Sequence, residues 1–280
     1  GSTSLTLNSS RLFQLFKYTV YAFLAMNVYW FFAEEYAAAP LRYPDGVGLA
    51  DLMEAYAATI DTLAWVILLL MFELETYVLD DKHFTKAVTW TLHGLRFACF
   101  AFIVMAFFGY VDVLEFNSGA ALFAGVSDIC ALPPGEWSWP YILGEYTVIT
   151  PANCADWSTA TEFYKFPDAA AVVDAAGLTD IIRLAWVDVI NAAVWILVVV
   201  LLEIDVRLQE HGRFEGFALR ASTVSKYVLY GTLFAAAVYW GFKGDFLDFW
   251  DAFLWLVAFV FIELNVFEWR EEDNAALQVA

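Results

Sequence analysis

Three copies of one motif place acidic side chains at a fixed spacing in apolar surroundings. In each copy an Asp or Asn is followed four residues later by Trp, and eight residues after that Trp by Glu. The copies are Asp61-x3-Trp65-x7-Glu73, Asn191-x3-Trp195-x7-Glu203 and Asp251-x3-Trp255-x7-Glu263. A carboxylate inside a membrane helix costs on the order of 2.5–3.5 kcal/mol at the bilayer centre, and marks a functional-site hypothesis by default.

The three glutamates support two interpretations. In the first, Glu73, Glu203 and Glu263 converge around a pseudo-threefold axis and bind a cation or proton, as acidic rings do in cation channels. In the second, each glutamate is a structural anchor near the cytoplasmic surface, paired with a cation from a neighbouring helix. The matching cations would be Lys17, Arg96 and Lys226.

Asp188 is a fourth candidate cation-binding residue. It follows Arg183 by five residues, a spacing at which two side chains on one helix are poorly placed to pair. Asp188 therefore either faces a water-filled vestibule together with Asn191 or lies at the membrane interface.

Motifs of common enzyme classes are absent from the sequence. It contains no glycine-rich phosphate loop, no H-E-x-x-H and no C-x-x-C. The histidines, His83, His93 and His211, are too far apart for a helical metal pair. The sequence therefore predicts neither an enzyme nor a cofactor, and it leaves open whether the carboxylates bind a metal.

The elements that must position these carboxylates are membrane helices. Charged residues make up 17% of the chain and hydrophobic residues 61%, whereas a soluble domain has roughly a quarter charged residues. Mean hydropathy is +0.61. A helix needs about 20 apolar residues to cross a bilayer. Six segments meet this need and predict an all-α integral membrane protein: 16–33, 60–79, 96–114, 183–203, 227–243 and 248–267.

The predicted spans form three hairpin repeats. The motif falls on every second span, and the other three spans open with a cation followed by an aromatic residue. We expect hairpins at 11–79, 90–207 and 222–268, related by an axis along the membrane normal.

Loop lengths divide the chain into four predicted regions. The first holds hairpin 1 and span 3, the second is an extracytoplasmic acidic loop domain, the third holds spans 4 to 6, and the last is a cytoplasmic tail. Their boundaries are 11–113, 114–182, 183–270 and 271–280.

The distribution of Lys and Arg predicts the orientation. With the N-terminus in the cytoplasm, ten of these 14 residues lie on the cytoplasmic side and four on the outside. This bias follows the positive-inside rule. We therefore expect both termini in the cytoplasm and the chain in a plasma membrane, such as a bacterial inner membrane.

The outer loop domain is acidic and contains two of the three cysteines. Ten Asp and Glu residues stand against one Lys between residues 111 and 180. Such a surface disfavours nucleic acid and enriches cations, although it is equally typical of a solvated outer domain. Cys130 and Cys154 share the oxidising side, where a disulfide typically contributes ~2–4 kcal/mol. Cys99 is expected to be a small core residue.

The sequence thus predicts a membrane protein that conducts or binds a cation, the proton included, through Glu73, Glu203, Glu263 and Asp188. The alternative is a non-transporting membrane subunit or scaffold that docks partner proteins through its acidic outer domain and Trp-rich spans. The expected partners are the lipid bilayer, cations, and other membrane subunits or a second copy of the chain.

The predicted orientation can be tested by cysteine labelling. Cysteines introduced at Ala38 and Ala169 should react with an impermeant maleimide in intact cells, because both positions are expected outside. A cysteine at Thr85 should remain unlabelled until the cells are opened. Labelling of Thr85→Cys alone in intact cells would overturn the orientation.

Overall fold

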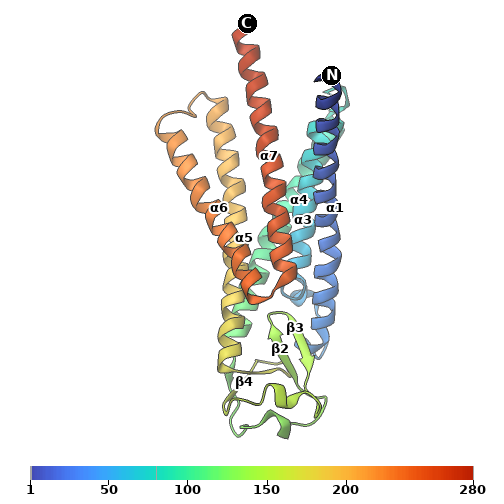
Figure 1. The fold of residues 1–280 in the computed structure, drawn as a ribbon, viewed down its shortest axis with the longest axis vertical. Coiled ribbons are helices and arrows are strands. Elements are labelled where there is room, and N and C mark those ends of the chain that lie inside the picture. Colours follow the sequence, from blue (N-terminus) through green and yellow to red (C-terminus); the bar gives the residue numbers. More distant parts are fainter. Residues whose placement is uncertain (1, 80, 280) are drawn as a thin grey trace. The chain divides into compact units, whose positions relative to one another are not determined.

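The computed structural model describes residues 2–79 and 81–279, and 73% of the chain is helical. The chain divides into two compact units. The first comprises Gly1–Asn27 and Glu215–Ala280, and the second comprises Val28–Phe214. Helix α1 (Ser2–Arg42) is one continuous helix (Figure 1). Its residues up to Asn27 belong to the first unit and those from Val28 to the second.

The second unit contains three long helices and the segments that join them. After α1, a 3₁₀ turn (Leu49–Asp51) leads into α2 (Leu52–Ala55) and α3 (Ala57–Glu73). A π-helical turn, Leu74–Val78, continues directly from α3. Helices α4 (Lys86–Ser118) and α5 (Ala175–Glu210) follow, and the segment between them carries the strands.

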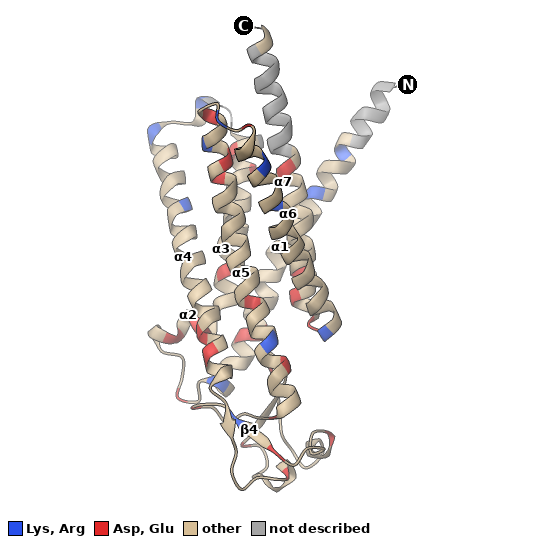
Figure 2. Ribbon diagram, turned by 90° about the vertical axis from the view of Figure 1, so that its left-hand side faces the viewer, with Lys and Arg blue, Asp and Glu red and all other residues tan. Residues whose placement is uncertain are grey.

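Within the part of the chain that the structure describes, three helices are long and apolar enough to cross a membrane. They cover Ala57–Thr76, Lys86–Ser118 and Ala175–Glu210. Their middle stretches, 62–72, 97–111 and 189–202, contain no charged residue, and Figure 2 shows the long uncharged stretch of α4. The expected spans 16–33, 227–243 and 248–267 also lie on helices, in α1, α6 (Phe217–Lys243) and α7 (Phe246–Val279). That these three helices cross the membrane stays a prediction, as do the three repeats.

Helix α4 packs between α3 and α5 through small and apolar side chains. Ala64 of α3 contacts Cys99 and Ile103 of α4 in one buried cluster. Leu114 of α4 and Ala185 of α5 belong to another. Cys99 is therefore a buried core residue with a free thiol, as the sequence predicts.

Gly109 allows α2 to lie against α4. A Cβ atom at this position would be 2.3 Å from the carbonyl oxygen of Met53, a distance that real Cβ atoms do not reach. The close approach of two backbones therefore requires glycine here.

In the first unit, α6 and α7 form a tight hairpin. Only Gly244 and Asp245 separate them, and Gly244 adopts the left-handed conformation that ends many helices (φ 75°). The α1 residues of this unit pack on α7 through aromatic rings: the ring centroids of Phe13 and Phe261 are 5.1 Å apart, edge to face.

The expectation of an all-α chain is wrong for the segment between α4 and α5, which contains two small antiparallel sheets. One has the strand order β1-β4-β5, and the other pairs β2 with β3. The strands are β1 (Ala121–Leu122), β2 (Ser138–Ile142), β3 (Glu145–Val148), β4 (Phe163–Lys165) and β5 (Val172–Asp174). Aromatic and β-branched residues favour strands, and Gly144, with φ 81°, supplies the turn between β2 and β3.

This segment has its own core and the predicted disulfide. Ile129, Phe163 and Val172 are completely buried in it. Cys130 and Cys154 are bonded, which confirms the prediction. Beside them, the hydroxyl of Ser158 and the backbone N–H of Cys130 donate to Asp128 at 2.6 and 2.9 Å. These two hydrogen bonds, in that order, hold the pKa of Asp128 below its ordinary value.

Two glycines of α4 test the packing against α2. Gly109→Ala should destabilise the protein by about 1–3 kcal/mol, because the new methyl group meets a backbone atom that no rotamer change can move. Gly94→Ala is the matched control, since nothing lies within 4 Å of its Cβ position. That control should be neutral or stabilise by about 0.5–1 kcal/mol, because alanine favours the helix. Equal unfolding midpoints in detergent for the two variants would contradict the close approach.

Candidate functional site

The first half of the repeated motif forms a hydrogen bond between a carboxylate and an indole. In α3, Nε1 of Trp65 donates to Oδ1 of Asp61 at 3.2 Å. Residues four apart are neighbours on a helix, so the motif spacing brings the two side chains together. A second donor comes from α4, where the Tyr110 hydroxyl lies 3.4 Å from the other carboxylate oxygen of Asp61.

The same arrangement occurs in α7. Trp255 donates to Asp251, again one turn earlier on the helix. The second donor is now an amide, because Nδ2 of Asn27 in α1 lies 3.0 Å from Oδ1 of Asp251. The Asn27 side chain is buried, with 1% of the residue exposed. In both helices, therefore, the motif carboxylate joins its own helix to a neighbouring one.

The α5 copy differs, as its sequence implies. Asn191 replaces the carboxylate, and its buried Oδ1 accepts no hydrogen bond within the described part of the chain. Trp195 lies beside Trp65, with ring centroids 6.3 Å apart. Asp188 is partly buried and lies three residues before Asn191, so α5 still offers a carboxylate about one turn from the motif position.

The three motif glutamates have three different environments. Glu73 is the last residue of α3 and is 5% exposed. The side chain of Glu203 is 63% exposed and pairs with Arg207 on its own helix at 3.0 Å. Glu263 accepts a hydrogen bond of 2.6 Å from the Tyr230 hydroxyl of α6. Glu73 and Glu203 belong to one unit and Glu263 to the other.

One of the cations expected beside these glutamates, Arg96, has a different partner. Arg96 pairs with Glu75 at 2.6 Å and not with a motif glutamate. The π-helical turn after Glu73 contains Glu75, and such turns are frequent at functional sites. Lys17 is completely buried in α1, and its Nζ lies 4.9 Å from the centroid of the Tyr18 ring.

A further group of polar residues joins the end of α1 to α2 and α3. Glu35 accepts hydrogen bonds from the backbone N–H groups of Ala58 and Thr59, at 3.3 and 2.8 Å, and from the Thr59 hydroxyl at 2.6 Å. The first N–H groups of a helix lack partners within the helix. Glu35 therefore caps α3 from another helix.

Sequence reasoning missed Glu35, although one signal for it exists. The N-cap residue of α3 is Tyr56, which provides no side-chain cap, and the first turn of α3 has no acidic residue. A helix start without a local cap indicates that an acceptor must come from elsewhere in the fold.

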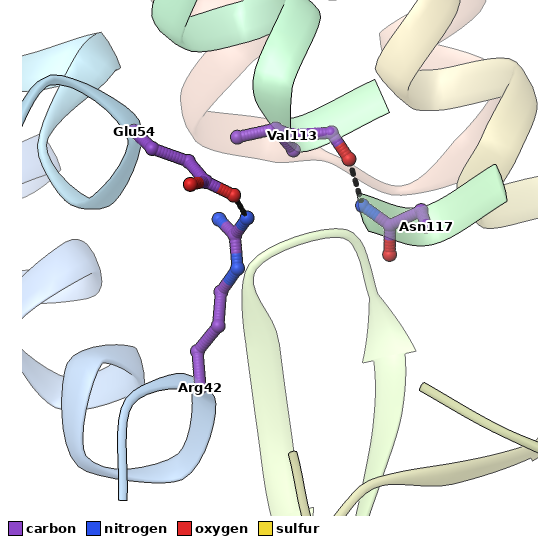
Figure 3. A network of polar contacts seen from close by, with 4 residues as sticks. All are labelled: Arg42, Glu54, Val113 and Asn117. Carbon is purple, nitrogen blue, oxygen red and sulfur yellow. Dashed lines mark hydrogen bonds and ion pairs between the residues drawn. The ribbon is translucent and has the colours of Figure 1, made fainter. Parts of the chain in front are cut away.

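Arg42 is the second member of this group. It forms an ion pair with Glu54 of α2, and its guanidinium carbon lies 4.3 Å from the ring centroid of Phe116 in α4. Figure 3 shows Arg42 extended toward Glu54, with Asn117 of α4 donating to the Val113 carbonyl nearby at 2.8 Å. Burial lowers the pKa of Arg42 from its ordinary value. The pair is thus built into the packing of three helices.

Among the residues that the structure describes, no group of three or more His, Cys, Asp or Glu side chains could together hold a metal ion. The candidate site is therefore a set of single carboxylates, each with its own hydrogen-bond donors. Such carboxylates can bind a proton or interact singly with a hydrated cation.

The two ion pairs Arg42–Glu54 and Arg207–Glu203 allow a matched test of burial. Glu54→Gln should destabilise the protein by about 3 kcal/mol, because it leaves a mostly buried guanidinium without its carboxylate. Glu203→Gln should cost less than about 1 kcal/mol, because both partners of that pair are exposed. Thermal unfolding in detergent should separate the two variants by several degrees. Equal midpoints would contradict the buried Arg42–Glu54 pair.

Comparisons with protein-family models, with curated proteins and with solved structures find no match to this chain. The chemistry and placement of its own side chains are therefore what indicate a function.

Proposed function

We propose that this chain binds a cation, the proton included, and passes it across a membrane through carboxylates on its long helices. The observation that carries this proposal is the pair Asp61 and Asp251. Both occupy the first position of the motif, and both accept hydrogen bonds from a Trp one turn later and from an adjacent helix. A carboxylate kept at the same place in two helices is costly in apolar surroundings, so a role in binding positive charge is favoured.

Neutral groups donate hydrogen bonds to both of these carboxylates. An indole and a phenol donate to Asp61, and an indole and an amide donate to Asp251. Neutral donors orient a carboxylate without cancelling its charge, unlike the arginines that pair with Glu75 and Glu203.

The motif places a second carboxylate farther along each helix. Twelve residues of α-helix rise about 18 Å, which separates Asp61 from Glu73 and Asp251 from Glu263 by more than half of a bilayer core. In α5, Asp188 and Glu203 take the corresponding places. We propose that these two levels of carboxylates are successive binding sites, since conduction needs several sites of moderate strength.

The proposed setting follows the charge pattern of the sequence. We propose that the chain has six spans in a plasma membrane, with both termini in the cytoplasm. In this topology the first-position carboxylates lie toward the outside and the glutamates toward the cytoplasm. The acidic segment between α4 and α5 would then raise the concentration of cations near the outer end.

A second candidate function rests on the ion pairs. Glu203 pairs with Arg207 and Glu75 with Arg96, as anchoring side chains near a membrane surface would. In that case the chain is a non-transporting membrane subunit or scaffold. It would dock other membrane subunits or another copy of itself through its spans and its acidic segment.

Flux measurements in liposomes distinguish the two candidates. Wild-type protein should carry protons or metal cations above the rate of empty liposomes, and both Asp61→Asn and Glu73→Gln should reduce the rate. We expect a loss of about tenfold or more, because 1.4 kcal/mol of lost binding changes occupancy tenfold.

Glu136→Gln is the control, since this glutamate is exposed in the segment between α4 and α5. It should leave the flux unchanged. Thermal unfolding of the same samples shows whether each variant is folded. A wild-type rate equal to that of empty liposomes for every cation would eliminate transport and favour the docking subunit.

A further inference from the structure

We propose that the cation is a proton and that Asp251 is a residue that takes it up. This inference rests on the proposed function for its role in transport, whereas proton binding by Asp251 can be measured without transport.

Asp251 has apolar neighbours on its own helix. It lies five residues after the start of α7, and the nearby Ala252 and Leu254 are 7% and 3% exposed. The Trp250 ring packs against Phe23 of α1 at 5.8 Å between centroids. An ionised carboxylate is costly in such surroundings, and a bound proton removes its charge.

The donors to Asp251 favour a proton over a metal ion. The amide of Asn27 and the indole of Trp255 both point N–H groups at the carboxylate, which uses two of its lone pairs. A dehydrated Ca²⁺ ion takes six to eight oxygen ligands, and Mg²⁺ takes an octahedron of oxygens. N–H donors oppose both a proton and a metal ion there, and a metal ion in addition requires several oxygen ligands, which these two donors do not supply. A proton needs only one of the remaining lone pairs.

Asp61 differs in its second donor. The Tyr110 hydroxyl can accept as well as donate, so the surroundings of Asp61 do not select a proton in the same way. The amide of Asn27 contributes its donor nitrogen to Asp251. The proposal is therefore specific to the α7 copy of the motif.

Besides Asp251, three elements of this unit carry ionisable groups: the turn before α7 together with its first turn, α6 and α1. Asp245, in the turn before α7, is hydrogen-bonded to Asp248, and burial raises the pKa of Asp245. Asp248 lies one turn before Asp251 on the same helix. From α6, Lys243 lies 5.9 Å from the centroid of the Tyr239 ring, and from α1 the buried ionisable side chains are Lys17 and Tyr21.

Infrared spectroscopy of the full-length protein in liposomes tests the inference. A protonated carboxyl gives a carbonyl band that a carboxylate lacks. Near neutral pH the wild type should show this band, Asp251→Asn should lose it, and Asp156→Asn, at an exposed position in the segment between α4 and α5, should retain it. Trp255→Phe should move the band to higher wavenumber, because the carboxyl loses one hydrogen bond. This second variant keeps the test valid if Asp251→Asn does not fold.

Proton flux and metal-cation flux are then measured on the same preparations. Asp251→Asn should reduce proton flux about tenfold or more. A band that is absent from the wild type, or that is unaffected by both variants, would overturn the proton site, and flux of Na⁺, K⁺ or Ca²⁺ would still uphold the proposed function. A band that depends on Asp251 without flux of any cation would uphold proton binding and eliminate transport.

Discussion

A polar group on an apolar helix must find its hydrogen-bond partners within the protein, and this constraint accounts for much of the structure. The indole N–H of Trp65 needs an acceptor, and the nearest position on the same face is one turn earlier. Asp61 occupies that position, and Asp251 does the same for Trp255. Each pair satisfies the Trp but leaves the carboxylate with unused lone pairs, so a second donor must come from another helix.

That second donor links the motif to the packing of the helices. Tyr110 ties α4 to α3, and Asn27 ties α1 to α7. The capping of α3 by Glu35 follows the same rule at a helix end, where backbone N–H groups and not an indole need an acceptor. In all three cases within the described residues, a carboxylate on one helix accepts a hydrogen bond from a donor on another helix.

The sequence predicted the features that depend on local spacing and failed on those that depend on neighbouring helices. Apolar runs predicted helices, and the shared loop predicted the bond between Cys130 and Cys154. The ion pair of Arg96 with Glu75 could not be predicted from the sequence, because the π-helical turn after Glu73 alters the direction in which the following side chains point. The short strands were missed because two to five residues give little periodicity among turns, and the contacts of Glu35 and Arg42 join segments with no common spacing.

The contact at Gly109 constrains how the sequence can vary. Many tight contacts in proteins are between side chains, and a smaller residue on one side can compensate for a larger residue on the other. Here the atom opposite the missing Cβ is the carbonyl oxygen of Met53, which every amino acid at that position would carry. No replacement of Met53 can therefore make room for a side chain at 109. Residue 109 is therefore held to glycine by the path of the backbone itself, whichever side chain residue 53 carries.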